Sequence, residues 1–287
     1  MDEWERWLSV DRYTGLSAQE VQGGMQLIAG IRAQLLREAG LGPGQSVLEI
    51  GCGPGEFLPI LLGVVGADGR VAALDVSEPL CARAAAVLAQ HPLGHRGQVA
   101  RGDMRALPHD ARTFDVVMCR AVLQYAGGDL PLVAGEIARV LRPGGRFVAF
   151  EVLSANERPL LPLPRTEGER RAHAEAAARW RRLPHRLSRG ALVKAFAPPA
   201  FAPSSVSASV VDWQQPFSRQ QFANVLAQVP RPGSPTLGEV YLQDLDPDLR
   251  RGWDSLLESA THAAQRGAWA YVSAVRAEGT ADGAAGA

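Results

Sequence analysis

The sequence has little of what would mark a secreted, metal-binding or nucleic-acid-binding protein. Its three cysteines, Cys52, Cys81 and Cys119, are widely spaced and include no C-x-x-C pair. This pattern indicates neither a disulfide framework nor a zinc or other metal site, and it favours a reducing cytoplasm. Lys194 is the only lysine, and Lys plus Arg (30) balance Asp plus Glu (30). With no net charge, the chain has no overall field that would attract nucleic acid or an anionic membrane.

Long apolar runs are also absent. The longest, residues 57–65, is far shorter than the roughly 20 residues that a membrane-spanning helix needs. The first residues, MDEWERWLSV, are acidic and amphipathic and do not resemble a signal peptide. We therefore expect a soluble cytoplasmic protein that does not contact a membrane. The sequence leaves the oligomeric state open, a homodimer included.

What the sequence does have is a regular alternation of short apolar runs and helical stretches. The runs cover residues 46–50, 70–75, 98–103, 114–119 and 146–153. This alternation predicts an α/β fold, a doubly wound parallel sheet with helical crossovers. Further strands are expected at residues 205–211 and 268–277, separated by a helical stretch that carries aromatic residues.

The remaining segments are expected to surround this sheet. Residues 1–40 predict an N-terminal cap of two helices, the second with apolar residues at three- and four-residue spacing. The main domain is expected to comprise residues 41–154 and 186–277, and residues 155–185 and about 214–266 are expected to be insertions that cover its site. The tail, residues 278–287, has too little apolar surface to fold and is expected to be disordered.

The string VLEIGCGPGEF, residues 47–57, is the strongest functional signal. A buried strand runs into a glycine turn, and a helix follows, so the backbone can approach a ligand closely at the positive end of a helix. A tight strand-to-helix turn without a ligand is the alternative reading. Glu49 precedes the turn and would suit an ammonium group. Asp75 ends the second strand, where it would accept from ribose hydroxyls, and Asp103 follows the third, where it would accept from an adenine amino group.

Taken together, VLEIGCGPG, VAALDVS, ARGDM, FDVVMCRAVLQY and LRPGGRFVAFE resemble the consecutive motifs of class I S-adenosylmethionine-dependent methyltransferases. The chain is similar to the small-molecule members related to ubiquinone and menaquinone biosynthesis. The resemblance implies a seven-stranded sheet of order 3-2-1-4-5-7-6 with an antiparallel last strand, S-adenosylmethionine as cofactor and S-adenosylhomocysteine as product. The cofactor-binding residues that it implies are Glu49, Gly51, Cys52, Gly53, Gly55, Asp75, Val76, Asp103, Met104, Cys119 and Arg120.

The acceptor side is less defined. Many small-molecule members carry a histidine pair after the fourth strand, but this chain has Gln124 and Tyr125 there. Candidates for a base are Glu151, His185 and Tyr125. The aromatic residues available to line an acceptor pocket, which ordinary core packing explains equally well, are Trp180, Trp213, Phe217, Phe222, Tyr241 and Trp253. The arginines of residues 165–189 would meet an acidic acceptor, although a solvated lid helix explains them better.

The expected reaction is an in-line displacement that methylates oxygen, nitrogen or carbon of a small aromatic or lipophilic metabolite, as in secondary metabolism. Two alternatives share the fold: a nucleic-acid or protein methyltransferase, and a non-methylating cyclase or binding protein that uses the same cofactor. Neutral charge and the lack of an RNA-binding appendage argue against a nucleic-acid substrate. A nicotinamide dehydrogenase is disfavoured because Gly55 comes one residue too early for G-x-G-x-x-G.

Overall fold

The computed structural model describes residues 18–183, 186–227 and 235–278, and the first expected N-terminal helix and almost all of the expected tail lie outside them. Its centre is an eight-stranded sheet in which β3-β2-β1-β4-β5 are parallel neighbours and β8 runs antiparallel beside β5. The strands are β1 (Ser46–Ile50), β2 (Arg70–Asp75), β3 (Gly97–Arg101), β4 (Phe114–Arg120), β5 (Leu141–Val152), β6 (Arg158–Pro162), β7 (Ser205–Pro216) and β8 (His262–Val275). The predicted α/β class and strand order are confirmed, with β7 as the sixth strand and β8 as the antiparallel last one.

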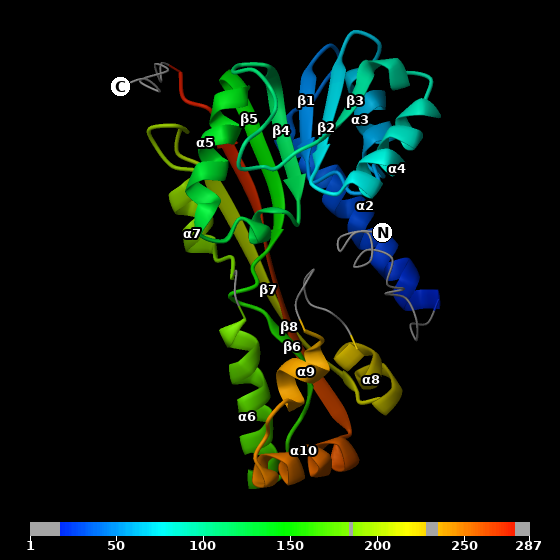
Figure 1. Cartoon of the computed structure of the whole chain (residues 1–287), viewed down its shortest axis with the longest axis vertical. Helices are drawn as coiled ribbons and strands as arrows, with labels where there is room; N and C mark the ends of the chain where they lie inside the picture. The colour runs from blue at the N-terminus through cyan, green and yellow to red at the C-terminus, as the bar shows by residue number, and fades with distance from the viewer. Residues whose placement is uncertain (1–17, 184–185, 228–234, 279–287) are drawn as a thin grey trace.

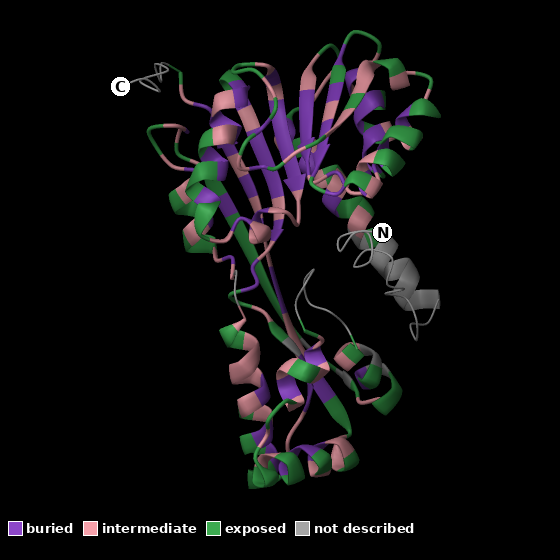
Figure 2. Ribbon diagram, viewed as in Figure 1, coloured by how far each residue is buried: buried purple, intermediate pink, exposed green. Residues whose placement is uncertain are grey.

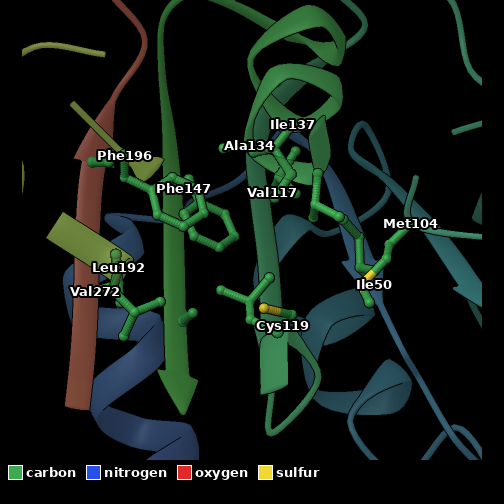
Figure 3. Close-up of a cluster of buried hydrophobic side chains, with 14 of the residues drawn as sticks. Ile50, Met104, Val117, Cys119, Ala134, Ile137, Phe147, Leu192, Phe196 and Val272 are labelled. Carbon is green, nitrogen blue, oxygen red and sulfur yellow. The ribbon is translucent and has the colours of Figure 1, made fainter. Parts of the chain in front are cut away.

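Helices cover both faces of the sheet (Figure 1). On one face lie α2 (Ala18–Ala39), α3 (Leu58–Val65) and α4 (Glu78–Ala89), and on the other α5 (Leu130–Val140) and α7 (Arg189–Ala195). Adjacent strand residues alternate between the two cores, because successive side chains of a strand point to opposite faces. Thus Val116 and Met118 join the α2–α3–α4 core, whereas Val117 and Cys119 join the core of α5 and α7 (Figure 3).

β7 and β8 form a ribbon that continues beyond the parallel strands (Figure 1). β7 pairs along one edge of β8 from Ser205 to Pro216, so β5 and β6 share the other edge. Both ribbon strands are longer than expected, since β7 extends past residue 211 and β8 begins before residue 268. Neither β6 nor α7 is anticipated by the sequence pattern. β6 contains two prolines, which argue against a strand because proline has no N–H to donate, and α7 is only 7 residues long.

At the far end of the ribbon lies what we call the helical lobe: α6 (Glu167–Arg182), α8 (Arg219–Ala227), α9 (Leu237–Leu242) and α10 (Pro247–Ser259). It has a hydrophobic cluster of its own, purple in Figure 2, built from residues of all four helices and β6. The carboxyl ends of β1, β4 and β5 point toward this lobe (Figure 1). Among the described residues, no helix combines the length and the apolar character needed to cross a membrane.

Candidate active site

The glycine turn after β1 has three residues in the left-handed region. The φ angles of Gly51, Gly53 and Gly55 are 69°, 54° and 85°, a region that L side chains adopt only with strain. A Cβ on Gly51 would also lie 2.3 Å from a methyl of Val122, and one on Gly55 would lie 2.7 Å from the Cα of Ala84. The turn is therefore fixed by its own conformation and by close neighbours on the segment after β4 and on α4.

Asp75, at the end of β2, holds this turn in place. One carboxylate oxygen accepts from the Gly53 N–H at 2.8 Å, and the other accepts from the Ser77 N–H at 3.0 Å. The residue is 8% exposed. Each carboxylate oxygen can accept a second hydrogen bond, so Asp75 can shape the loop and still accept from a ligand.

Glu49 and Arg120 carry buried polar atoms that lack a partner. Glu49 is 4% exposed, and its Oε2 accepts no hydrogen bond from any described residue. Burial raises the pKa of Glu49 to about 8, against the opposing charges of Arg120 and Arg32. The Arg120 Nε is likewise buried and without a partner within the described part of the chain. Because buried polar groups are nearly always paired, a ligand with complementary charges at the ends of β1 and β4 would give both atoms the partner that they lack.

Asp103 lies on the loop after β3, with 47% of its side chain exposed. Its Oδ1 accepts from the Arg105 N–H at 2.8 Å, so it also stabilises its own turn. The Arg105 guanidinium bridges Asp103 to Asp129 and donates to the Tyr125 carbonyl at 2.9 Å. Arg105 thereby ties the expected adenine loop to the segment after β4. Next to these loops, Met104 is buried and Val76 is 42% exposed.

The cysteines of the site are packing residues. Cys52 and Cys119 are 7% and 1% exposed. Burial raises the pKa of both thiols above the ordinary value, and nearby carboxylates raise it further. Both therefore stay protonated at neutral pH, when a thiol is a poor nucleophile.

Of the three candidate bases, Glu151 is fully buried behind the segment after β4. Its Oε1 accepts from the Val122 and Leu123 N–H groups, each at 3.0 Å, and from the Cys119 thiol at 3.4 Å. It thus caps the 3₁₀ turn η2 (Leu123–Tyr125). Burial raises the pKa of Glu151 to about 7, although these hydrogen bonds oppose the rise. Its Oε2 is buried and meets no donor among the described residues.

The other two candidates are placed differently. Tyr125 ends η2 and packs, partly buried, against the core of α5 and α7. His185 lies outside the described residues. Before η2, Ala121 has a φ of 58° and donates its N–H to the Phe150 carbonyl at 2.8 Å. The segment 121–125 is thus held in a strained conformation by β5, with Glu151 as its principal anchor.

Comparison with known proteins agrees with this geometry. Residues 47–145 match the family model of a methyltransferase domain. The malonyl-[acyl-carrier protein] O-methyltransferase of Salmonella typhimurium is 35% identical over 131 residues, 46% of this chain and 48% of that protein. A demethylmenaquinone methyltransferase of Symbiobacterium thermophilum is 34% identical over 110 residues, 38% of this chain and 43% of that protein. The chain contains a class I S-adenosylmethionine-dependent methyltransferase domain.

The two curated relatives are matched over less than half of their length. Over nearly the whole chain, the fold is similar to a solved geranyl diphosphate C-methyltransferase from Streptomyces coelicolor A3(2). That comparison covers 94% of this chain and 87% of the other, with a TM-score of 0.54 and 14% identity. At that identity the likeness concerns the fold alone, but it includes the ribbon and the helical lobe as well as the methyltransferase domain.

The aromatic residues expected to line a pocket mostly build the core of the helical lobe. Phe222, Tyr241 and Trp253 are 2%, 1% and 1% exposed, and they pack on one another. Phe217 and Trp180 pack against the same cluster from its edge, and the side chain of Trp213 is outside the described set. Core packing, the alternative left open by the sequence, therefore accounts for the three buried members.

Several arginines of α6 are paired along the helix. Arg170 bonds to Glu167 at 2.8 Å, and Arg179 bonds to Glu175 at 2.9 Å. These pairs fit a solvated helix better than an acidic-substrate site.

Arg32 and Arg105 lie at the methyltransferase domain's candidate site but have no motif in the sequence. Arg32, on α2, bonds to Glu56 at 2.9 Å and lies 5.7 Å over the Phe57 ring, so α2 reaches the helix that follows the glycine turn. Arg105 follows Asp103 by two residues. Its bridging role is visible only in the folded structure, where the loop after β3 lies beside Asp129. Spacing along the chain gives no signal for either residue, because their partners come from distant elements.

Proposed function

We propose that this chain transfers the methyl group of S-adenosylmethionine to a small molecule by in-line displacement. The observation that carries the proposal is the set of groups around the glycine turn. The turn is open to close backbone approach, Asp75 lies beside it, and Glu49 and Arg120 present unpartnered buried atoms. Such an arrangement suits a zwitterionic nucleoside.

The donor fits these residues group by group. Glu49 would pair with the ammonium group of the donor's amino-acid end, and Arg120 with its carboxylate. Both the Glu49 Oε2 and the Arg120 Nε would then have a hydrogen-bond partner. Asp75 would accept from the ribose hydroxyls with the lone pairs left after its bonds to Gly53 and Ser77. Asp103 would accept from the adenine amino group with the remaining lone pair of Oδ2. Its Oδ1 already accepts from the Arg105 backbone N–H, and Oδ2 accepts from the Arg105 guanidinium at 3.3 Å.

When bound, the donor supplies a methyl group on a sulfonium, which is already an activated leaving group. The chain's own contribution is then positional. Cys119 and Ala121 line the end of β4 with small side chains, and the Glu151 cap fixes the following turn. Holding nucleophile and methyl group in line, away from water, is worth about 7–11 kcal/mol in well-oriented systems.

A base is needed only if the acceptor must lose a proton. Glu151 has a buried Oε2 that meets no donor in the described part of the chain and a pKa of about 7, which suits a proton acceptor at neutral pH. Its bonds to Val122 and Leu123 suit a positioning role equally. Tyr125 stays a candidate because η2 follows β4 at the same edge of the sheet, and His185 stays a candidate from the sequence alone.

We further propose that the helical lobe covers the site when substrates bind. The carboxyl ends of β1, β4 and β5 point toward the lobe (Figure 1). The lobe is attached through the β7–β8 ribbon and β6, and it has its own core. A separately packed body beyond the strand ends would exclude water from the reacting groups.

The test is label transfer. Full-length protein is incubated with S-[methyl-³H]adenosylmethionine and a panel of quinol, phenol, carboxylate and phosphate acceptors, and transferred label is measured. We expect label in a small molecule and none in added RNA or protein. Tight cofactor binding with no transfer to any acceptor would instead favour a non-methylating cyclase or binding protein.

A further inference from the structure

A second pocket lies on the other side of the segment after β4. It has a volume of about 400 Å³ and lies between η2, the start of α5 and α7. The residues that line it are Leu123, Gln124, Gly127, Gly128, Leu130, Pro131, Arg186, Leu187, Ala191, Lys194 and Ala195. This volume falls in the range of about 300–1,000 Å³ typical of small-molecule sites.

The floor of the pocket is apolar. Leu123, Leu130 and Leu187 are buried at 1%, 4% and 5% exposure, and Ala191 and Ala195 pack on the same core. The position of Leu187 is fixed, since its N–H donates to the Ser154 hydroxyl at 2.9 Å. The apolar floor is thus part of the folded core.

The rim, in contrast, is cationic. Lys194, the chain's only lysine, projects from α7 and forms no ion pair within the described residues. Arg186 adds a second cation, held by a 2.8 Å bond to the Trp180 carbonyl. No carboxylate lines the pocket. The nearest in sequence, Asp129, is engaged by Arg105 at 2.8 Å.

The pocket adjoins the candidate active site through one short segment. Val122 packs on Gly51 of the glycine turn, while the next two residues, Leu123 and Gln124, line the pocket. Glu151 holds both parts of this segment through the Val122 and Leu123 N–H groups. A molecule seated in the pocket therefore lies one segment away from the proposed donor.

We propose that this pocket binds the anionic end of the methyl acceptor, an amphipathic small molecule with an apolar body and a carboxylate or phosphate group. This inference rests on the proposed methyl transfer and specifies its acceptor class. Burial of the apolar body on the leucine floor supplies affinity, and the two cations select the charge.

The probe is n-octyl phosphate, titrated calorimetrically into unmodified full-length protein. n-Octanoate serves as the carboxylate form, and n-octanol and octyltrimethylammonium serve as neutral and cationic controls. We expect the two anions to bind and the two controls to bind at least about fivefold more weakly, as expected for loss of a partly exposed charge pair. Equal binding of octanol and octyl phosphate would overturn the proposal.

Lys194 allows the site to be located directly. Reductive ¹³C-methylation labels a single lysine side chain besides the terminal amine, because the chain has no other lysine. Octyl phosphate should shift the Lys194 dimethylamine resonance, which the Lys194→Gln variant identifies by its absence. Binding that leaves this resonance unmoved would place the probe elsewhere and contradict the inference.

Charge reversal provides the matched comparison. Lys194→Glu should weaken octyl phosphate binding by about tenfold or more. Arg171→Glu, at an exposed arginine of α6 outside the pocket, should change it less than twofold. S-adenosylhomocysteine is titrated into the same samples. If it binds normally while octyl phosphate does not, the acceptor inference fails and the proposed donor site stands. If saturating S-adenosylhomocysteine displaces octyl phosphate, the probe occupies the donor site and the inference also fails.

Discussion

Three buried carboxylates at the sheet edge have different tasks, and their surroundings distinguish them. Asp75 is satisfied by backbone N–H groups, Glu151 is satisfied at one oxygen, and Glu49 has an oxygen without a donor. Asp75, with one donor on each oxygen, shapes the loop that it holds and keeps lone pairs for a ligand. A carboxylate oxygen left without a donor in the described residues is destabilising by itself, and a cationic ligand would relieve it.

Glu49 should therefore lower stability while it supports ligand binding. Burial holds its pKa at about 8, against an ordinary value of 4.5. The folded state then binds more protons than the unfolded state between these values, so Glu49 increasingly destabilises the folded state as pH rises from 4.5 toward 8. Glu49→Gln cannot ionise and should gain melting temperature over wild type at pH 8 but not at pH 5.

The same substitution should weaken binding of S-adenosylhomocysteine, because the amide cannot pair with an ammonium group. Wild-type affinity should rise between pH 6 and pH 8 as Glu49 ionises, and the variant should lack this rise. Calorimetric titration at several pH values measures both. A Glu49→Gln protein with wild-type affinity and pH dependence would show that the ammonium lies elsewhere.

Glu151→Gln separates positioning from proton transfer. Its pKa of about 7 predicts, for a base, a methylation rate that rises with pH through that value. If Glu151 is the base, Glu151→Gln should lower the methylation rate at every pH by a factor of about 10²–10⁴. The amide oxygen can still accept from the Val122 and Leu123 N–H groups, so a purely positioning Glu151 would leave the pH profile unchanged and the rate within about tenfold.

At the scale of elements, the buried carboxylate of Glu169 links two helices of the helical lobe. Glu169 closes a capping box with Thr166 at the start of α6, and its Oε1 accepts from the Ser255 and Ser259 hydroxyls of α10 at 2.8 and 2.9 Å. The helices also approach closely, since a Cβ on Gly252 would lie 2.4 Å from the Gly168 carbonyl oxygen. Burial alone would raise the pKa of Glu169, but the hydrogen bonds lower it to about 2.

Glu169→Ala should destabilise the protein by about 2–3 kcal/mol, because it removes a helix cap and leaves the partly buried Ser255 and Ser259 hydroxyls without their acceptor. Since the folded pKa is depressed from 4.5 to about 2, the stabilisation is present above pH 4.5 and is lost as pH falls toward 2. Thermal unfolding across this range measures it. Glu167→Ala is the matched control, with an exposed ion pair to Arg170. Equal effects of the two substitutions would contradict this role.

The parallel part of the sheet can be predicted from the sequence because each strand is a local apolar run, and β1, β2 and β4 are each followed by a helix. β1 and β2 occupy the expected residues 46–50 and 70–75. The glycine turn and Asp75 are equally local, since they follow directly from strand ends. β6 and the full length of β7 cannot be predicted from the local sequence, because both pair with β8, which comes more than 45 residues later in the chain.

At the scale of the whole molecule, two packed bodies are joined by one long antiparallel ribbon. The methyltransferase domain presents its strand ends toward the helical lobe, whose core is assembled from β6 and four helices distant in sequence (Figure 1). Sequence patterns indicate helical segments in that lobe but give neither its four separate helices nor their association, which depends on contacts such as Phe222 against Trp253. For the same reason the role of Arg105 as a bridge between loops becomes visible only in the fold.

The most direct test of the central claim is calorimetric binding of S-adenosylhomocysteine to wild type, Asp75→Ala and Asp68→Ala. Asp75 ends β2 at the proposed donor site, whereas Asp68 precedes the opposite end of the strand and is exposed. Each charge-assisted bond to the ribose is worth about 1.5–3 kcal/mol, so Asp75→Ala should bind at least about tenfold more weakly. Asp68→Ala should bind as wild type does. Undiminished binding to Asp75→Ala, or no binding to wild type, would contradict the account.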